Sequence, residues 1–159
     1  MSFSLVFFSS SDGGKSEEVV KVKLLVGAAK LPARATPGAA GYDLHAAESV
    51  LLQPRSTVAV RTGVALEMSR NVFAFAVGRS GLALDRSITV HTGTIDPDFR
   101  GEVKLILHNL SPVNGHRIGV SDRIGQLIFL PLSTPRLLLT DRLEETLRGE
   151  RGFGSTGTN

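Results

Sequence analysis

The chain has 159 residues, 42% of them hydrophobic, and a formal net charge of +3, which together match one globular domain with a single core. Its basic residues are spread along the sequence instead of forming one cluster, so the composition argues against a nucleic-acid-binding surface. The absence of cysteine excludes disulfides, thiolate metal sites and thiol catalysis.

The first seventeen residues contain an apolar patch from Leu5 to Phe8, which has no basic leader and is too short for a signal-peptide core or a membrane span. We therefore expect a soluble intracellular protein of the cytoplasm or nucleus, without a membrane partner. Two interpretations of residues 1–17 stay open: a disordered N-terminal arm, or an arm in which the patch forms an edge strand or packs on the domain.

From Val19 onward, short apolar runs alternate with Gly, Pro, Asp and Ser, which is typical of an all-β domain with many short strands. Residues 103–109 alternate between two faces, whereas residues 72–77 are apolar throughout, as in a strand covered on both faces. Short helical turns fit only residues 80–86 and 140–149. The pattern predicts a sandwich, jelly roll or small barrel over residues 18–147, with no repeat and no second domain.

Asp43, in "AAGYDLHAAES", is either a turn carboxylate or a partner for a cation. The four histidines show neither HxH nor HExxH spacing, so a protein-caged transition metal is not expected. Mg²⁺ keeps its waters and relies on phosphate oxygens with one or two carboxylates, and Asp43 would suffice for that role.

The stretch "VGRSGLA" places Arg79, Ser80 and Gly81 directly after an apolar strand. The nucleophile pattern GxSxG is absent, so Ser80 suits a hydrogen-bond donor better than a nucleophile. Gly81 would let a backbone N–H approach a ligand closely. The alternative is an ordinary turn between a strand and a loop.

The stretch "TGTIDPDFRGEV" is interpreted as a hairpin, with turn residues from Asp96 to Asp98 and a strand from Glu102. Asp96 is either a structural turn residue or a carboxylate held beside a reacting group as a general base.

The last twelve residues, "RGERGFGSTGTN", have glycines spaced as GxxGxG and lack Gly-Lys-Ser/Thr, which excludes the dinucleotide fingerprint and the P-loop. A disordered tail and a lid that wraps an anion both remain open, because exposed N–H groups lie beside Arg148 and Arg151.

Taken in order, "AAGYDL", "GRSGLA", "GTIDPDFRG", "DRIGQLIF" and "RGERGFGSTG" cover residues 31 to 157 and closely resemble the five motifs of the deoxyuridine triphosphatase (dUTPase) family. The resemblance implies a jelly-roll-like distorted β-barrel subunit, a homotrimer with sites shared between chains, and Mg²⁺-dependent hydrolysis of dUTP to dUMP and pyrophosphate. That reaction keeps uracil out of DNA and supplies dUMP for dTMP synthesis.

The resemblance also implies a role for each matching residue. Asp96 would activate water, Phe99 would lie under the deoxyribose, and Asp43 would orient a metal-bound water. Substrate would be bound by two further groups. The body of the domain would supply Arg79, Ser80, Gly81, His91, Thr92, Gly93, Thr94, Ile95 and Gln126, with residues 91–95 forming a hairpin that reads uracil. A flexible lid of residues 148–159 would supply Arg148, Phe153, Gly154, Ser155 and Thr156.

Two alternatives are less consistent with these residues. A dCTP deaminase of related fold would need a glutamate over the pyrimidine ring, where this chain has Asp96. A regulatory or interaction module derived from a dUTPase would have no reason to keep Asp96, Arg148 and Phe153 together.

Overall fold

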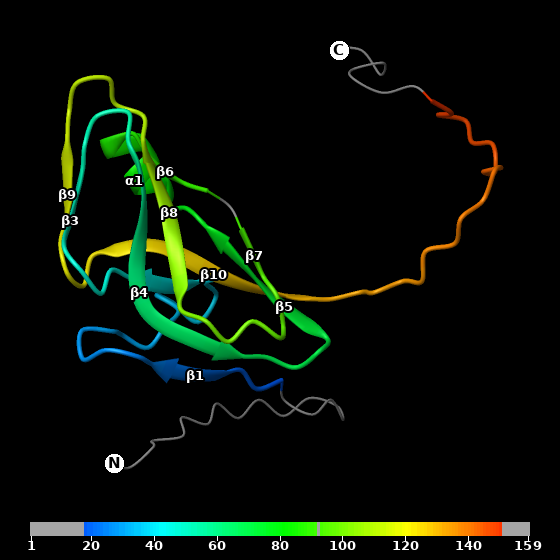
Figure 1. The fold of residues 1–159 in the computed structure, drawn as a ribbon, viewed down its shortest axis with the longest axis horizontal. Helices are drawn as coiled ribbons and strands as arrows, with labels where there is room; N and C mark the ends of the chain where they lie inside the picture. The colour runs from blue at the N-terminus through cyan, green and yellow to red at the C-terminus, as the bar shows by residue number, and fades with distance from the viewer. Residues whose placement is uncertain (1–17, 92, 151–159) are drawn as a thin grey trace.

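The computed structural model describes residues 18–91 and 93–150, which form an all-β body with one short helix (Figure 1). The strands are β1 Lys21–Leu24, β2 Tyr42–His45, β3 Val50–Leu52, β4 Thr57–Glu67, β5 Val72–Val77, β6 Ile88–Val90, β7 Gly93–Ile95, β8 Val103–Asn109, β9 His116–Ile118 and β10 Arg123–Pro131. The helix is α1 Ser80–Arg86. The predicted all-β class and the short helix over residues 80–86 are confirmed.

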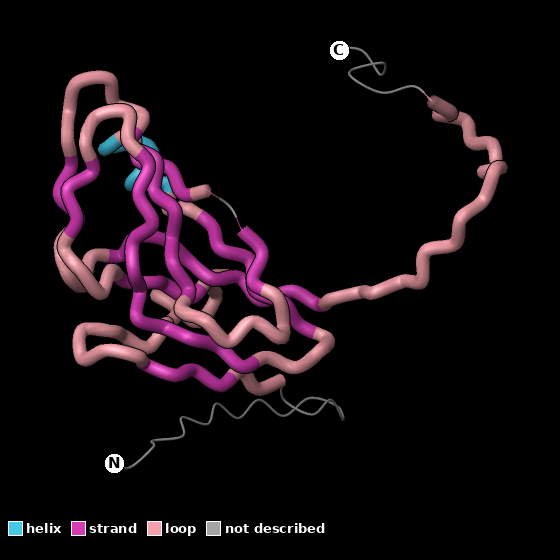
Figure 2. The backbone as a smooth tube through the Cα atoms, viewed as in Figure 1, coloured by secondary structure: helices cyan, strands magenta, loops and turns pink. Residues whose placement is uncertain are grey.

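The strands form two four-stranded antiparallel sheets, in the orders β1-β4-β8-β6 and β2-β10-β5-β7, and a two-stranded ribbon of β3 and β9 (Figure 2). The two larger sheets supply most of the buried apolar core, and they do not close into a complete barrel. At one point Gly125 of β10 approaches Leu105 of β8 so closely that a Cβ at position 125 would lie 2.5 Å from the leucine methyl group. This jelly-roll-like packing is consistent with the predicted subunit fold.

The alternation predicted for residues 103–109 is confirmed, because Val103, Leu105 and Leu107 are buried while Lys104 and Ile106 are exposed. Residues 72–77 form a strand as expected, but in a single chain this strand is not fully covered on both faces. In β5, Ala74 and Ala76 point into the core, whereas the face that carries Phe73 and Phe75 is only half-buried.

The helical turn suggested for residues 140–149 is absent from the structure, in which most of this segment is irregular, with a bend at residue 141 and a bend and turn at residues 147–149. After β10 the chain leaves the body, and residues 133–150 run outward as an extended segment that we call the arm (Figure 1). Its leucines are exposed, including Leu137, Leu139 and Leu147 at more than nine-tenths. A ten-residue helix without a surface to pack on is marginal in water, which explains why the pattern failed here.

The hairpin interpretation of residues 92–103 is also wrong, as the described residues 93–103 show. β7 pairs with β5 in one sheet, whereas β8 pairs with β4 and β6 in the other. Nor do β6 and β7 pair with each other among the described residues: β6 lies in one sheet and β7 in the other, so these two strands do not form the hairpin expected for residues 91–95. Local turn residues were recognised correctly, but the pairing depends on the whole fold.

Within residues 18–91 and 93–150, no helix is long and apolar enough to cross a membrane. The N-terminal arm of residues 1–17, Thr92, and the lid residues from Arg151 onward lie outside the described residues. The proposed domain boundaries therefore stay predictions.

Candidate active site

Asp43 is the centre of a polar cluster on the sheet of β2, β10 and β5. It lies on β2, directly opposite Gln126 of β10, and is 5% exposed. Its backbone N–H donates to the carbonyl of Ala33 at 2.8 Å, which ties the strand to the preceding loop. A carboxylate so far removed from water must find charged or hydrogen-bonding partners.

Three side chains supply those partners, two from β10 and one from the segment after β5. Gln126 Nε2 donates to Asp43 Oδ1 at 3.1 Å, and Arg123 Nη1 donates to Oδ2 at 3.2 Å. Arg79 Nε lies 3.7 Å from Oδ1, an ion pair without a short hydrogen bond, and Arg79 Nη1 donates to the Arg123 carbonyl at 3.3 Å. We call Asp43, Arg79, Arg123 and Gln126 the Asp43 cluster.

The electrostatics of the cluster favour a charged Asp43. Burial alone would raise the pKa of Asp43, but hydrogen bonds from Gln126 and Arg123 and the charges of Arg79 and Arg123 outweigh it and hold the pKa below its ordinary value. With two cations and one anion, the cluster keeps a net positive charge. That charge is held in place before any ligand arrives.

An open cleft of about 410 Å³ lies beside this cluster. Arg79, Gly81, Arg86 and Arg123 line it, together with two acidic side chains, Asp85 and Asp122. Ser80 and Gly81 begin α1 and are exposed. Guanidinium groups are donors that phosphate oxygens accept from, so the arginines of the cleft suit a phosphorylated ligand, and the Ser80 hydroxyl lies next to Arg79 and Gly81 in the chain.

Gly41 explains why a glycine precedes Tyr42 and Asp43. A Cβ at position 41 would lie 2.9 Å from Gln126 Oε1 and 3.0 Å from Gln126 Cβ. Any side chain there would push Gln126 away from Asp43, so the glycine in "AAGYDL" keeps the cluster closed.

Arg123 lies within "DRIGQLIF", and the motif resemblance implies no role for it. In a regular strand, residues 123 and 126 would point to opposite faces. An irregularity in register between Arg123 and Gly125 adds one residue, so both side chains reach Asp43. No pattern in the sequence indicates that irregularity.

A second group of predicted residues lies on the loop between β7 and β8. Asp96 is exposed, and its carbonyl accepts from Phe99 N at 3.1 Å to close a turn. Arg100 Nη1 donates to the Pro97 carbonyl at 2.7 Å, which stiffens the same turn. The Phe99 ring is 43% exposed and lies against Gly101, where a Cβ would approach its Cζ to 2.6 Å.

Within one chain these two groups do not meet. Asp96 follows Ile95, which pairs with Ala74, whereas Arg79 comes after the far end of β5. At about 3.3 Å per residue, Asp96 and Arg79 are separated by roughly 20 Å along the strand direction. Figure 1 shows α1 and the β7–β8 loop at opposite ends of β5.

The remaining predicted residues are divided between edge positions and the arm. His91 is exposed, and its N–H donates to the Ile106 carbonyl at 2.8 Å. Gly93 and Ile95 pair with Ala76 and Ala74 of β5, and Thr94 lies exposed between them. Arg148 lies in the exposed arm. Thr92, Phe153, Gly154, Ser155 and Thr156 lie outside the described residues.

In the described part of the chain, no three His, Asp or Glu side chains are close enough to cage a metal ion. Asp43 does fit the outer shell of a hydrated Mg²⁺. Each of its oxygens accepts one hydrogen bond from the protein, and a carboxylate oxygen has two lone pairs, so each can still accept from a metal-bound water.

Comparison with protein families supplies an independent result. The family model described as dUTPase matches residues 28–157. The deoxyuridine 5'-triphosphate nucleotidohydrolase of Paramecium bursaria Chlorella virus 1 is 42% identical over 136 residues, which cover 86% of this chain and 96% of the viral one. The enzyme of the same name from Oryza sativa subsp. japonica is 41% identical over 143 residues, covering 90% of this chain and 83% of the rice protein.

Solved structures agree with this similarity. The dUTPase of Staphylococcus bacteriophage 80alpha, with dUpNHpp, is 28% identical, covers 88% of this chain and 99% of the phage chain, and superposes with a TM-score of 0.83. A dUTPase from phage phi11 of S. aureus, described with a structural Mg(II) ion, has the same fold at 24% identity and a TM-score of 0.76, covering 80% of this chain and 99% of its own.

Proposed function

This chain belongs to the dUTPase family and hydrolyses dUTP to dUMP and pyrophosphate, and we propose how its residues divide that reaction between subunits. The observation that carries the proposal is the Asp43 cluster: a buried carboxylate that holds two arginines and a glutamine beside an open cleft.

The phosphates of dUTP bind in the cleft beside α1. Arg79 and Arg123 present guanidinium groups that Asp43 already holds in place, so little side-chain entropy is lost when the triphosphate binds. Ser80 Oγ and Gly81 N–H donate to phosphate oxygens at the start of α1. Gln126 remains the amide link between this cleft and Asp43.

Asp96 acts as the general base. It is an exposed carboxylate on a turn closed by Phe99 and Arg100. A water molecule loses its proton to Asp96 as its oxygen attacks the α-phosphorus in line, the bond from that phosphorus to the bridging oxygen breaks, and pyrophosphate leaves with the bond's electron pair. The proton on Asp96 then returns to solvent.

Mg²⁺ is the metal that this site suits, and Asp43 would hold it through one of its waters. When bound, the ion neutralises part of the charge of the triphosphate. The residues of this chain orient the phosphates and take up the proton.

The base is read by backbone groups at an edge of the sheet. β7 is the edge strand of its sheet among the described residues, so the N–H and C=O groups on its outer side have no strand partner there. Uracil offers an O4 acceptor and an N3–H donor, which such groups can pair with, whereas cytosine has the reverse polarity at both positions. Phe99 lies under the deoxyribose and leaves no room for a 2′-hydroxyl.

The complete site forms between chains of a homotrimer. Three observations support this arrangement: the roughly 20 Å between Asp96 and Arg79 along the strand direction, the half-covered Phe73 and Phe75 face of β5, and the exposed leucines of the arm. The lid from residue 148 onward closes over the nucleotide, with Arg148 on the γ-phosphate, Phe153 stacked on uracil, and Gly154, Ser155 and Thr156 donating to the triphosphate.

The proposed chemistry is tested by hydrolysis in ¹⁸O-labelled water with Mg²⁺. Attack at the α-phosphorus places the label in dUMP. Label in pyrophosphate would show attack at the β-phosphorus and would remove Asp96 from the position proposed for it. Parallel assays with dCTP, dTTP and UTP measure the selectivity for base and sugar.

A further inference from the structure

Strand β4 contains a bulge at the point where it faces the end of the β7–β8 loop. Arg61 pairs with Lys104 and Val64 with Val103, so Thr62 and Gly63 are extra residues on β4. Gly63 has φ of +67°, and a Cβ at this position would lie 2.6 Å from Ala29 Cβ. The bulge therefore requires glycine, and its backbone N–H is turned away from the ladder.

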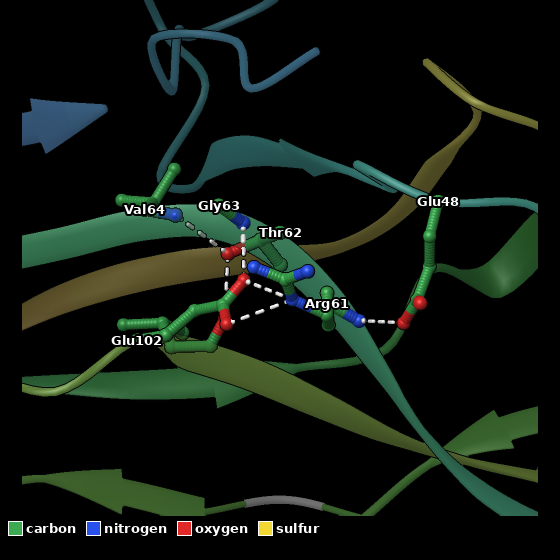
Figure 3. A network of polar contacts seen from close by, with 7 residues as sticks. Glu48, Arg61, Thr62, Gly63, Val64 and Glu102 are labelled. Carbon is green, nitrogen blue, oxygen red and sulfur yellow. Dashed lines mark hydrogen bonds and ion pairs between the residues drawn. The ribbon is translucent and has the colours of Figure 1, made fainter. Parts of the chain in front are cut away.

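Glu102 fills the space beside this bulge (Figure 3). Its Oε1 accepts from Gly63 N at 2.8 Å, and its Oε2 accepts from Arg61 Nε at 3.0 Å. The Glu102 side chain is only 13% exposed, whereas the Arg61 side chain that it contacts is 44% exposed, so Glu102 itself is largely removed from water. A charged acceptor with two donors and little solvent access has one strongly preferred position.

The residues that donate hydrogen bonds to Glu102 lie in a part of β4 that is itself held by further hydrogen bonds. Arg61 N donates to Glu48 Oε1 at 2.8 Å, and the Arg61 carbonyl accepts from Ala47 N at 2.8 Å. Thr62 Oγ1 donates to the Val103 carbonyl at 2.5 Å, immediately after Glu102 in the chain. These contacts tie β4, the turn at Ala47 and Glu48, and the start of β8 to one point, and Figure 3 shows Glu48 and Glu102 on either side of Arg61.

Glu102 directly follows the segment of residues 96–101, which we call the Asp96 loop. The loop begins after Ile95, which is buried and paired with Ala74, and ends at Glu102. Both ends are therefore attached to rigid strands. The second end is held by the pairing of Val103 with Val64 and by the contacts of Glu102 with the bulge.

We propose that Glu102 is a positioning residue for catalysis, which through the Gly63 N–H and the Arg61 guanidinium fixes where the Asp96 loop presents Asp96 and Phe99. This inference rests on the proposed function, in which Asp96 takes the proton and Phe99 lies under the sugar. A displacement of the order of 1 Å in a catalytic group costs up to about 10²-fold in rate, so a slack loop reduces turnover without removing any reacting group.

The test compares Glu102→Ala with Glu102→Gln. Alanine releases both donors, and we expect kcat for dUTP to fall about tenfold or more. Glutamine keeps the volume and an acceptor for Gly63 N–H, so we expect kcat within about threefold of the parent. The matched control is Glu67→Gln, which removes an exposed ion pair with Lys21 elsewhere on β4 and should leave kcat unchanged.

A second readout separates positioning from simple loss of stability. Glu102→Ala should also lower the ratio of kcat/KM for dUTP to that for UTP, because Phe99 no longer lies firmly under the sugar. A fall in the number of folded molecules lowers both substrates equally and leaves this ratio unchanged. All assays are run at a temperature where circular dichroism shows each variant to be folded.

Three outcomes decide the matter. A slower Glu102→Ala variant with a reduced ratio supports the inference. An unchanged kcat, or equal losses for dUTP and UTP, overturns it even if the variant is less stable. Asp96→Asn is measured in parallel, and normal turnover of that variant would overturn the proposed base itself, which distinguishes failure of the function from failure of the inference.

Discussion

Asp43 and Asp96 have different environments, which suit them to the different roles proposed for them. Asp43 is buried between two arginines and a glutamine, so its charge is already compensated and it is poorly suited to take a proton. Asp96 is exposed, and no ion pair joins it to a cation in the described part of the chain. Of the two carboxylates, Asp96 is therefore the one suited to general-base catalysis.

Replacing Asp96 with asparagine should separate binding from chemistry. The amide has nearly the same shape but cannot take up a proton at neutral pH, so kcat should fall on the order of 10²–10⁴-fold. Affinity for a non-hydrolysable dUTP analogue, measured by calorimetry, should stay close to that of the parent. A variant that binds the analogue poorly would instead assign Asp96 to substrate binding.

Asp43 should make the free energy of unfolding depend on pH in the acidic range. Its pKa is lowered in the folded chain, so its charge stabilises the fold at every pH above its unfolded value near 3.8. That contribution declines as the pH falls below this value, through the lower folded pKa. Urea unfolding of the parent and of Asp43→Asn between pH 2.5 and 6 measures the difference.

The expected sign is specific. The parent should lose more stability than Asp43→Asn on acidification below about pH 4. Only the parent has a carboxylate at position 43, and the folded state favours its charged form. Parallel curves for the two proteins over this range would show that the Asp43 cluster does not stabilise the charged form.

The strands themselves could be predicted where alternation was clear. Residues 103–109 form β8 as expected, since their apolar side chains recur with the period of a strand. Their partners could not be predicted, because pairing of β7 with β5 and of β8 with β4 depends on contacts between residues far apart in the chain. The hairpin interpretation failed for that reason.

The candidate site likewise contains residues that the sequence motifs predicted and residues that only the three-dimensional pairing reveals. Asp43, Arg79 and Gln126 were named from motif resemblance, and the structure brings them together. Arg123 was missed because only a register irregularity turns it to the face of Gln126. The role of Glu102 depends on the bulge at Gly63, which likewise has no local signature. The roles proposed for the lid residues stay predictions.

The β4 bulge should be sensitive to a single methyl group. Gly63→Ala places a Cβ 2.6 Å from Ala29 Cβ at a positive φ, so we expect a loss of about 2–4 kcal/mol in the free energy of unfolding. Gly27→Ala is the matched control, because a Cβ at position 27 meets nothing within 4 Å. Equal denaturation midpoints for the two variants would show that the bulge relaxes without cost.

The surface of residues 18–91 and 93–150 supports the proposal that the working unit contains more than one copy of the chain. The arm exposes Leu137, Leu138, Leu139, Leu143 and Leu147, and the face of Phe73 and Phe75 is only half-covered. An apolar surface of this kind is usually covered by a partner. In the proposed trimer, a neighbouring copy supplies the Asp96 loop to the cleft beside Arg79, because the two lie roughly 20 Å apart along the strand direction within one chain.

The central claim is that one site takes Asp96 and Arg79 from different chains, and complementation tests it most directly. Asp96→Asn and Arg79→Ala are each nearly inactive alone under this account. Mixed in equal amounts, unfolded in urea and refolded together, they form trimers of both variants. Each variant alone and the parent, taken through the same procedure, are the controls.

Random assembly would leave about a quarter of the sites with an intact Asp96 from one chain and an intact Arg79 from another. The account predicts that the mixture regains up to about that fraction of the refolded parent's dUTP hydrolysis. If Asp96 and Arg79 of the same chain served one site, no mixed trimer would contain an intact site. Activity no higher than the average of the two separate variants would therefore contradict the shared site.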